Sequence, residues 1–343
     1  MGRHVWSTFL CGVAVALLSL AVVACGAHHA TSPLSGPGVG RPLPSIMAEP
    51  WLKISDEYNV LLEGPAFDRA GHLYFVDVFA KGTIFRVNLS DKDVTTVYDD
   101  GQSSFASVDI HADGRLFACD PFGEKILAMN PDGTGVTEIP SAYEGEATAP
   151  DDIVFDGEGN FYFADYQGSA ANPTGRVFRV SSDYREIDLV AAGLASPNGI
   201  SLSPDGRRLW IGESGRNALV ELTLAEDGVT LLGARSILSD VLGASWPYEF
   251  TYEASPDSNA VDEDGNIYQA VFGRGTFVVF DSSAVPVAQV VMPGTADGLH
   301  LLSTNLAFQP GTDRAFATAG GKGGAWIFTF KGLAQGLCPF SHH

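Results

Sequence analysis

Short apolar runs alternate with polar turns along most of the chain after residue 60. A typical unit has an apolar run, a turn containing aspartate and glycine, and a second run rich in aromatic and β-branched residues. A third apolar run follows several units, at 83–87, 176–180 and 276–280. A weaker sixth unit passes through Phe308 and Gly311. The five clear turn glycines are Gly71, Gly114, Gly159, Gly206 and Gly265.

The spacing of these turns predicts the architecture. Successive turn glycines lie 43, 45, 47 and 59 residues apart, which suits a four-stranded unit with its loops. Helical periodicity is hard to find after the N-terminal segment. We therefore predict an all-β chain folded as a six-bladed β-propeller with a central metal site, in which strands near 46–62 help to close the ring. The longest interval contains an insertion, 238–253, which is a candidate lid.

Four oxygen-bearing side chains occupy one repeated position, eight residues before a turn glycine: Glu63, Asp151, Asn198 and Asp257. The innermost strand of a propeller blade borders the central channel, and the turn after it lies at the opposite end. These residues should therefore begin four inner strands and converge at one channel mouth. The second blade has Ala106 at this position, and the sixth has residues near Thr304 and Asn305.

This set of side chains predicts a hard cation. Carboxylate and amide oxygens, without histidine or thiolate, suit Ca²⁺, which accepts about six to eight oxygens in flexible geometry. Three carboxylates would repel one another without the cation, so the metal should stabilise the fold. The alternative is that these residues are turn and capping groups, because Asp and Asn beside Pro or Gly are common in loops.

Composition narrows the class of partner. The chain has 343 residues, of which 45% are hydrophobic and 18% charged, enough apolar residues to bury a core. It has 41 acidic and 20 basic residues, a formal charge of −21. A nucleic-acid backbone would be repelled, so nucleic acid is not an expected partner. Most of the carboxylates are expected to form a solvated surface.

The N-terminus has the pattern of a targeting segment. Residues 1–24 combine Arg3 with an apolar stretch over 9–23 that is short for a bilayer span. The end of this stretch, Val22-Val23-Ala24-Cys25, resembles a bacterial lipobox, which predicts a lipid anchor on Cys25 at the outer face of the cell membrane. An ordinary signal peptide, giving a secreted or periplasmic protein, or an uncleaved signal anchor are the alternatives. Residues 25–45 are then a flexible tether, and 46–343 form the propeller.

Two cysteines remain outside this segment, Cys119 and Cys338. An exported protein permits a disulfide between them, and two isolated buried thiols are an equal alternative. The sequence contains no Cys-x-x-Cys pattern or Cys/His cluster, so it does not support a structural zinc site.

Several motifs together resemble one known family. They are Glu63-Gly64-Pro65, Pro150-Asp151-Asp152, Ser196-Pro197-Asn198-Gly199-Ile200, and Pro256-Asp257-Ser258 with 262–268. They are similar to the signature of the senescence-marker-protein/gluconolactonase superfamily of six-bladed propellers, and within it to the drug-responsive lactonases of bacteria. The likeness extends from about residue 58 to 334.

The resemblance implies a calcium ion held by Glu63, Asp151, Asn198 and Asp257, with Ser258 as an additional ligand. It also implies hydrolysis of lactones, with Asp257 as the acid/base residue. Asp152 is a second candidate for proton transfer, or else a supporting residue at the start of a strand.

The chain departs from its relatives in places. Related sequences often carry asparagine where this chain has Asp151. A second, structural calcium of the lactonases would fall near 143–148, where the local match is poor. Related propellers use histidines near the metal, and His300 could approach the mouth or simply pack in the fold.

Two functions follow as expectations. The first is a calcium-dependent lactonase with a small-molecule lactone substrate and a side activity on aryl esters. The second is a non-catalytic exported propeller whose ion is structural and whose face binds a protein or glycan partner. A serine-hydrolase mechanism lacks a nucleophile-elbow sequence. The insertion could add an apolar rim for a neutral lactone, or cover the propeller face, through Trp246, Pro247, Tyr248, Phe250 and Tyr252.

Overall fold

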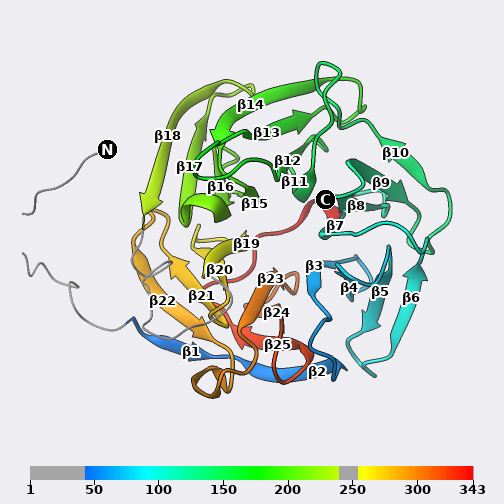
Figure 1. Ribbon diagram of the computed structural model, residues 1–343, viewed down its shortest axis with the longest axis vertical. Helices are drawn as coiled ribbons and strands as arrows, with labels where there is room; N and C mark the ends of the chain where they lie inside the picture. Colours follow the sequence, from blue (N-terminus) through cyan, green and yellow to red (C-terminus); the bar gives the residue numbers. More distant parts are fainter. Residues whose placement is uncertain (1–42, 239–253, 343) are drawn as a thin grey trace, which may run out of the picture. The chain divides into compact units, whose positions relative to one another are not determined.

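The strands of the computed structural model form six sheets arranged around a common axis (Figure 1). The structure describes residues 43–238 and 254–342. Apart from three short 3₁₀ turns (Ser214–Arg216, Thr295–Asp297 and Phe340–His342), the assigned elements of this part are strands. The prediction of an all-β, six-bladed propeller is confirmed.

Each blade runs outward from an inner strand. The inner strands are β3 (Leu62–Phe67), β7 (Ser107–Ile110), β11 (Pro150–Phe155), β15 (Pro197–Leu202), β19 (Ser255–Val261) and β23 (Leu302–Phe308). The second strands are β4 (His72–Asp77), β8 (Leu116–Asp120), β12 (Phe161–Asp165), β16 (Arg208–Glu213), β20 (Ile267–Phe272) and β24 (Arg314–Gly320). The third strands are β5 (Ile84–Asn88), β9 (Lys125–Met129), β13 (Gly175–Val180), β17 (Ala218–Leu224), β21 (Thr276–Phe280) and β25 (Ala325–Lys331). The outer strands of the first five blades are β6 (Val94–Tyr98), β10 (Thr137–Ile139), β14 (Ile187–Leu194), β18 (Leu231–Leu238) and β22 (Pro286–Val291).

The chain's N-terminal strands close the ring. β2 (Glu49–Ser55) pairs antiparallel with β25 and completes the sixth blade. β1 (Ser45–Met47) pairs in parallel with β22 and adds a fifth strand to the fifth blade. The sixth blade thus combines strands from both ends of the described chain. Closure of this kind leaves few exposed sheet edges.

The turn residues have the local structure that the repeat requires. Gly71 has a φ of 82°, in the left-handed region that favours glycine. Asp68 and Asp156 each accept a hydrogen bond from the amide four residues later, at 2.8 Å and 3.0 Å. Asp113 and Asp205 accept from the amide two residues later, at 3.0 Å and 3.1 Å. These local bonds explain why Asp and Gly recur together at these turns.

The hydrophobic core is divided among the interfaces between blades. Among the described residues, six clusters of buried side chains each combine residues of two adjacent blades. At one interface Phe117 of the second blade meets Phe155 of the third, edge to face, with ring centroids 5.2 Å apart. Each blade therefore buries both of its faces. For this reason the second strands contain apolar runs and do not strictly alternate between apolar and polar residues.

A C-terminal segment, 332–342, crosses the turn side of the ring after β25 (Figure 1). The Gly336 amide donates to the Thr312 carbonyl at 2.9 Å. Arg69 of the first blade donates to the Ser341 carbonyl at 2.7 Å. Phe340 stacks on Phe155 of the third blade, with centroids 5.5 Å apart. This C-terminal segment thus links blades on opposite sides of the axis at the end away from the inner-strand starts.

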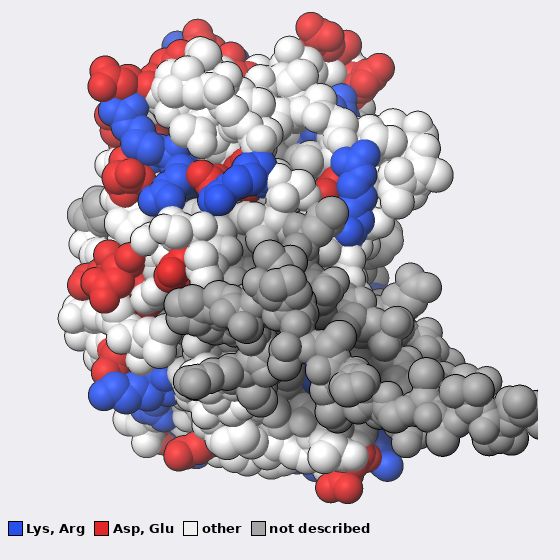
Figure 2. Space-filling model, turned by 90° about the vertical axis from the view of Figure 1, so that its left-hand side faces the viewer, with Lys and Arg blue, Asp and Glu red and all other residues white. Residues whose placement is uncertain are grey.

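Charged side chains are spread over the surface. On the side shown in Figure 2, acidic and basic groups are interspersed over the described residues. No helix in the described ranges is long and apolar enough to span a membrane. The targeting segment, Cys25 and the candidate lid with its aromatic residues lie outside the described residues. The proposed domain limits within 1–46 therefore stay predictions.

The two cysteines of the folded region are both free thiols. Cys119 is buried in β8, whereas Cys338 is exposed in the C-terminal segment. Neither of the two arrangements considered for them, a disulfide or two buried thiols, describes this pair.

Candidate functional site

The four residues that stand eight positions before a turn glycine lie at the starts of four inner strands. Glu63 is the second residue of β3, Asp151 of β11 and Asn198 of β15. Asp257 and Ser258 are the third and fourth residues of β19. The four acidic and hydroxyl side chains among them are 2–9% exposed. The repeat thus brings these groups to the same end of the ring.

A shift in strand register recurs at these starts. Pairing between the first and second strands slips by one residue after Glu63, Pro150, Pro197, Pro256 and Ser303. Such β-bulges re-aim side chains that a regular strand would point elsewhere. In the second blade, β7 pairs with β8 in unbroken register. This blade has Ala106 at the repeated position. The blade without a predicted ligand is therefore also the one whose inner strand pairs regularly.

The buried carboxylates influence one another. Burial, and then the charges of Asp257, Asp152 and Asp151, raise the pKa of Glu63 well above its usual range. Burial, and then Asp151 and Asp152, raise the pKa of Asp257 in the same way, while a hydrogen bond from Asn198 lowers it. Among the described residues, the charges that shift these two pKa values all belong to acidic side chains. The site therefore gathers acidic groups, and in the described part of the chain no basic residue compensates them in either shift.

The donor atoms of this site suit a hard cation. The Asn198 side-chain oxygen is buried and has no hydrogen-bond partner, whereas its amide hydrogen-bonds Asp257. An orphaned oxygen beside uncompensated carboxylates is the chemistry that Ca²⁺ accepts. In the described ranges, however, no three acidic, histidine or cysteine side chains are gathered closely enough to hold an ion by themselves. A cation site here therefore needs the amide oxygen of Asn198 in addition to the carboxylates.

Hydroxyl groups from neighbouring blades hold the backbone of the ligand-bearing strands. Ser107 of the second blade donates to the Asp151 carbonyl at 2.5 Å. Thr304 of the sixth blade donates to the Leu62 carbonyl at 2.6 Å. The two blades without a predicted carboxylate or amide ligand therefore support the blades that have one. The sequence offered no signal for these bonds, because they join residues with no fixed spacing.

Buried acids at the ends of second strands fix the entry to three inner strands. Asp77 accepts from the Leu61 amide at 3.1 Å, and Asp165 from the Ala149 amide at 2.7 Å. Glu213 accepts from the Ala195 amide at 2.8 Å. Each contacted amide lies one or two residues before an inner strand, so these acids help to set where Glu63, Asp151 and Asn198 emerge.

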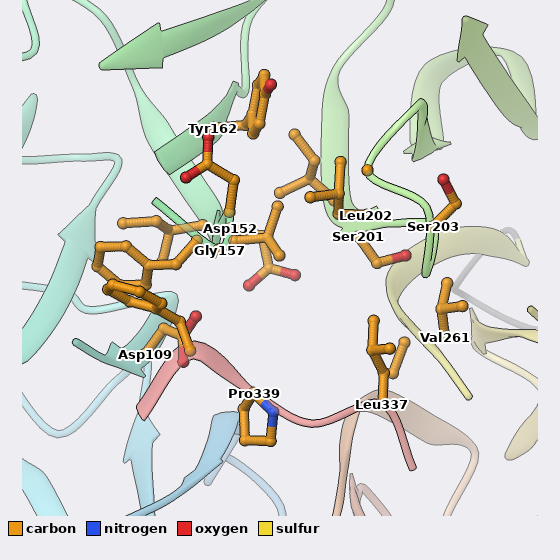
Figure 3. Close-up of a pocket in the computed structure, with 18 of the residues that line it drawn as sticks. Asp109, Asp152, Gly157, Tyr162, Ser201, Leu202, Ser203, Val261, Leu337 and Pro339 are labelled. Atoms are coloured by element: carbon orange, nitrogen blue, oxygen red, sulfur yellow. The ribbon is translucent and has the colours of Figure 1, made fainter. Parts of the chain in front are cut away.

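A cavity of about 810 Å³ lies on the other side of this layer, toward the turns. Asp109 and Asp152 line it, together with residues 337–340 of the C-terminal segment (Figure 3). Glu63, Asp151, Asn198 and Asp257 are not among its lining residues. The candidate cation ligands therefore lie outside this cavity, at the starts of the inner strands.

Asp152 connects the two sides. The hydroxyls of Ser258 and Ser107 and the amide of Ile200, from three other blades, lower the pKa of its carboxyl, so they face this group. Burial outweighs them and raises the pKa of Asp152 to about 7. This arrangement favours a supporting role for Asp152, the second of the two roles considered for it.

Other candidate residues lie outside this group. His300 is 8% exposed, donates from Nδ1 to the Pro293 carbonyl (2.8 Å) and packs on Phe328, with ring centroids 5.1 Å apart. Near the suggested second calcium site, Glu146 pairs with Arg176 at 3.3 Å.

Tyr166 had no assigned role from the sequence. Burial, Asp151 and Asp257 raise its pKa to about 12, which places its hydroxyl within their electrostatic reach. The residue is 40% exposed, so it presents an aromatic surface to solvent beside the buried acids.

Known proteins provide a separate comparison. A family model described as the SMP-30/gluconolactonase/LRE-like region matches residues 61–318. Lactonase drp35 of Staphylococcus saprophyticus is 41% identical over 315 residues, covering 90% of this chain and 94% of that protein. Lactonase drp35 of Staphylococcus aureus is 37% identical over 307 residues, covering 87% and 91%.

Solved structures share the fold at lower identity. A luciferin-regenerating enzyme has a TM-score of 0.67 and 19% identity, covering 85% of this chain and 98% of its own. A gluconolactonase from Xanthomonas campestris has a TM-score of 0.65 and 21% identity, covering 85% and 99%. Regucalcin, a calcium-binding protein from Agrobacterium tumefaciens, has a TM-score of 0.65 and 16% identity, covering 87% and 99%. The family expected from the motifs is confirmed: this chain belongs to the SMP-30/gluconolactonase/LRE-like family.

Proposed function

We propose that this protein is a calcium-dependent hydrolase that opens lactone rings. The Asn198 side-chain oxygen supports this proposal most directly, because it is buried without a hydrogen-bond partner beside acidic groups whose pKa values no basic residue lowers in the described part of the chain. Relatives at 37–41% identity bear the name lactonase, which supports the reaction class. Glu63, Asp151, Asn198, Asp257 and Ser258 would hold the ion.

The chemistry divides between the ion and the side chains. Bound calcium would polarise the lactone carbonyl and stabilise negative charge on its oxygen. Asp257 would accept a proton from the attacking water and deliver it to the ring oxygen as the ring C–O bond breaks, which leaves a hydroxy acid. The Asn198 amide, hydrogen-bonded to Asp257, orients that carboxylate.

The surroundings favour a neutral substrate. Tyr166, partly exposed and close to Asp151 and Asp257, offers an aromatic surface for an uncharged ring. A chain with a formal charge of −21 would help to expel the carboxylate product. We extend the proposal to a side activity on aryl esters, since these also place a carbonyl beside a good leaving oxygen.

The place of action is a separate proposal. Cys25 directly after an apolar stretch supports a lipid anchor at the outer face of the cell membrane. Mass spectrometry of the native N-terminus should find an acylated Cys25, and an unmodified or differently cleaved terminus would contradict this.

The function is tested on the 26–343 segment with a panel of small lactones and aryl esters, with calcium and with a chelator. We expect lactone hydrolysis to require calcium. Asp257→Asn should retain calcium binding but lose about 100-fold or more in kcat, because general acid–base catalysis contributes on that scale. Hydrolysis that is untouched by the chelator would contradict the metal mechanism. Calcium binding with no turnover of any substrate would favour the non-catalytic scaffold.

A further inference from the structure

The fifth blade contains a buried polar pair where other blades are apolar. Asn259 pairs with Gln269 directly after the register shift of β19, and the two side chains are 5% and 0% exposed. In four other blades the residues paired at the same place are Val108–Ala118, Ile153–Phe163, Ile200–Ile211 and Leu306–Ala317. In the first blade the pair directly after the register shift is Ala66–Tyr74. The exception is the blade that carries Asp257 and Ser258.

Gln269 compensates for the interrupted strand pairing. The register shift between Pro256 and Asn259 takes the Asp257 and Ser258 carbonyls out of the regular ladder. The Gln269 side-chain nitrogen donates to the Asp257 carbonyl at 2.8 Å and to the Ala270 carbonyl at 3.0 Å, and it faces the Ser258 carbonyl at 3.2 Å. Carbonyl oxygens only accept, so this orientation of the amide follows from its partners. Gln269 thus ties the Asp257 carbonyl to β20 and lies against the carbonyl of the next residue of the candidate site.

A second layer holds Gln269 in this orientation. Asn259 donates from its amide to the Gln269 side-chain oxygen at 3.2 Å. Ser201 of the fourth blade donates in turn to the Asn259 side-chain oxygen. A Cβ atom at Gly212 would lie 2.3 Å from the Asp257 carbonyl oxygen and 3.2 Å from the Gln269 nitrogen, so glycine leaves room for the pair. The network therefore spans two blades and is closely enclosed.

Burying two amide side chains costs desolvation free energy, which indicates that this network has a role beyond folding. Buried amides lose their hydration and are stabilising only when their hydrogen bonds are made, whereas apolar pairs serve the same place in other blades. The third and fourth blades keep their register shifts with apolar pairs. A propeller blade thus has no general need for Gln and Asn here.

We propose that Gln269, supported by Asn259, is a positioning residue that sets the backbone of Asp257 and Ser258. The expected effect on catalysis rests on the proposed function. The expected effect on the backbone position of Asp257 and Ser258 does not depend on it. Supporting groups of this kind typically change metal affinity or activity by about 10- to 100-fold when removed.

The test uses two substitutions of similar shape, Gln269→Met and Gln269→Glu, in the 26–343 protein. Met removes both hydrogen-bonding ends, and Glu retains the acceptor but loses the donor. Calcium affinity is measured by calorimetry, and kcat and KM are measured separately with a lactone that the wild type hydrolyses. We expect calcium affinity and kcat to fall about 10- to 100-fold with little change in KM. Ile211→Val, at the matching position of the fourth blade, should change neither. Wild-type calcium affinity and kcat in both Gln269 variants would overturn the proposal, as would an equal loss in Ile211→Val.

A double variant guards against simple misfolding. Asn259→Ile with Gln269→Ile recreates the Ile200–Ile211 pair of the fourth blade, and replacing both hydrogen-bonding partners by apolar groups is often nearly neutral for stability. It should fold, yet show the same loss of calcium affinity. If the wild type neither binds calcium nor hydrolyses lactones, the proposed function is wrong, but the positioning role of Gln269 can still be tested. Crystal structures of the wild type and the double variant test it: a displaced Asp257–Ser258 backbone in the double variant supports the role, and an unchanged backbone overturns it.

Discussion

The hydroxyl of Ser107 donates a hydrogen bond to the main-chain carbonyl of Asp151, 2.5 Å away in the next blade. Ser107 is 2% exposed and belongs to the second blade, which has no carboxylate or amide at the repeated position. The bond shows that a blade without a predicted ligand still shapes the site, by fixing the strand that carries Asp151.

Ser107→Ala should destabilise the protein by about 1–3 kcal/mol, because the buried Asp151 carbonyl would lose the hydrogen-bond donor that Ser107 supplies. The free energy of unfolding is measured in urea at fixed calcium concentration. Ser90→Ala, at an exposed turn, is the control and should change it by less than about 0.5 kcal/mol. Equal effects of the two substitutions would show that the hydroxyl contributes nothing specific.

Asp109 should make stability depend on pH. Burial raises the pKa of this carboxyl from 3.8 to about 7. The folded protein therefore keeps a proton that the unfolded chain releases near pH 4, and the resulting stability falls as pH rises from about 4 to 7. Asp109→Asn should remove this dependence. Its unfolding free energy should match the wild type near pH 4 and exceed it by roughly 1–3 kcal/mol at pH 8. A constant difference across this range would contradict the assignment.

The C-terminal segment should stabilise the ring through Phe340. This ring stacks on Phe155 and meets His111 edge to face, with centroids 4.9 Å apart. Phe340→Ala should cost about 2 kcal/mol, since the ring is partly exposed and loses both aromatic contacts. Thermal unfolding is the measurement. Leu333→Ala, at a residue 48% exposed in the same segment, should have little effect, and a similar loss there would argue against a specific role for Phe340.

The two thiols should differ in reactivity. Burial raises the pKa of the Cys119 thiol well above its usual range, whereas Cys338 is exposed. The folded 26–343 protein should react with a thiol reagent at one cysteine, and the denatured protein at two. Peptide mapping should identify Cys338 as the fast site. Two fast thiols, or none after denaturation, would contradict the free and unequal cysteines of the structure.

The repeated unit and its phase are properties that the sequence alone determined. Aspartate and glycine specify each turn through local bonds and left-handed backbone, as at Asp68 and Gly71. Counting back from a turn of fixed geometry therefore locates the start of the inner strand. For this reason the placement of Glu63, Asp151, Asn198 and Asp257 on four inner strands could be predicted without coordinates.

The supporting contacts were decided by the tertiary structure. Thr304 reaches the Leu62 carbonyl, and Arg69 reaches Ser341, across more than two hundred residues of sequence. No periodicity relates such pairs, because they exist only after the ring closes and its ends meet. Gln269 falls between these cases. Its polar character among apolar counterparts is visible in the sequence, but the carbonyls that it holds became apparent only when the register shift of β19 placed them beside it.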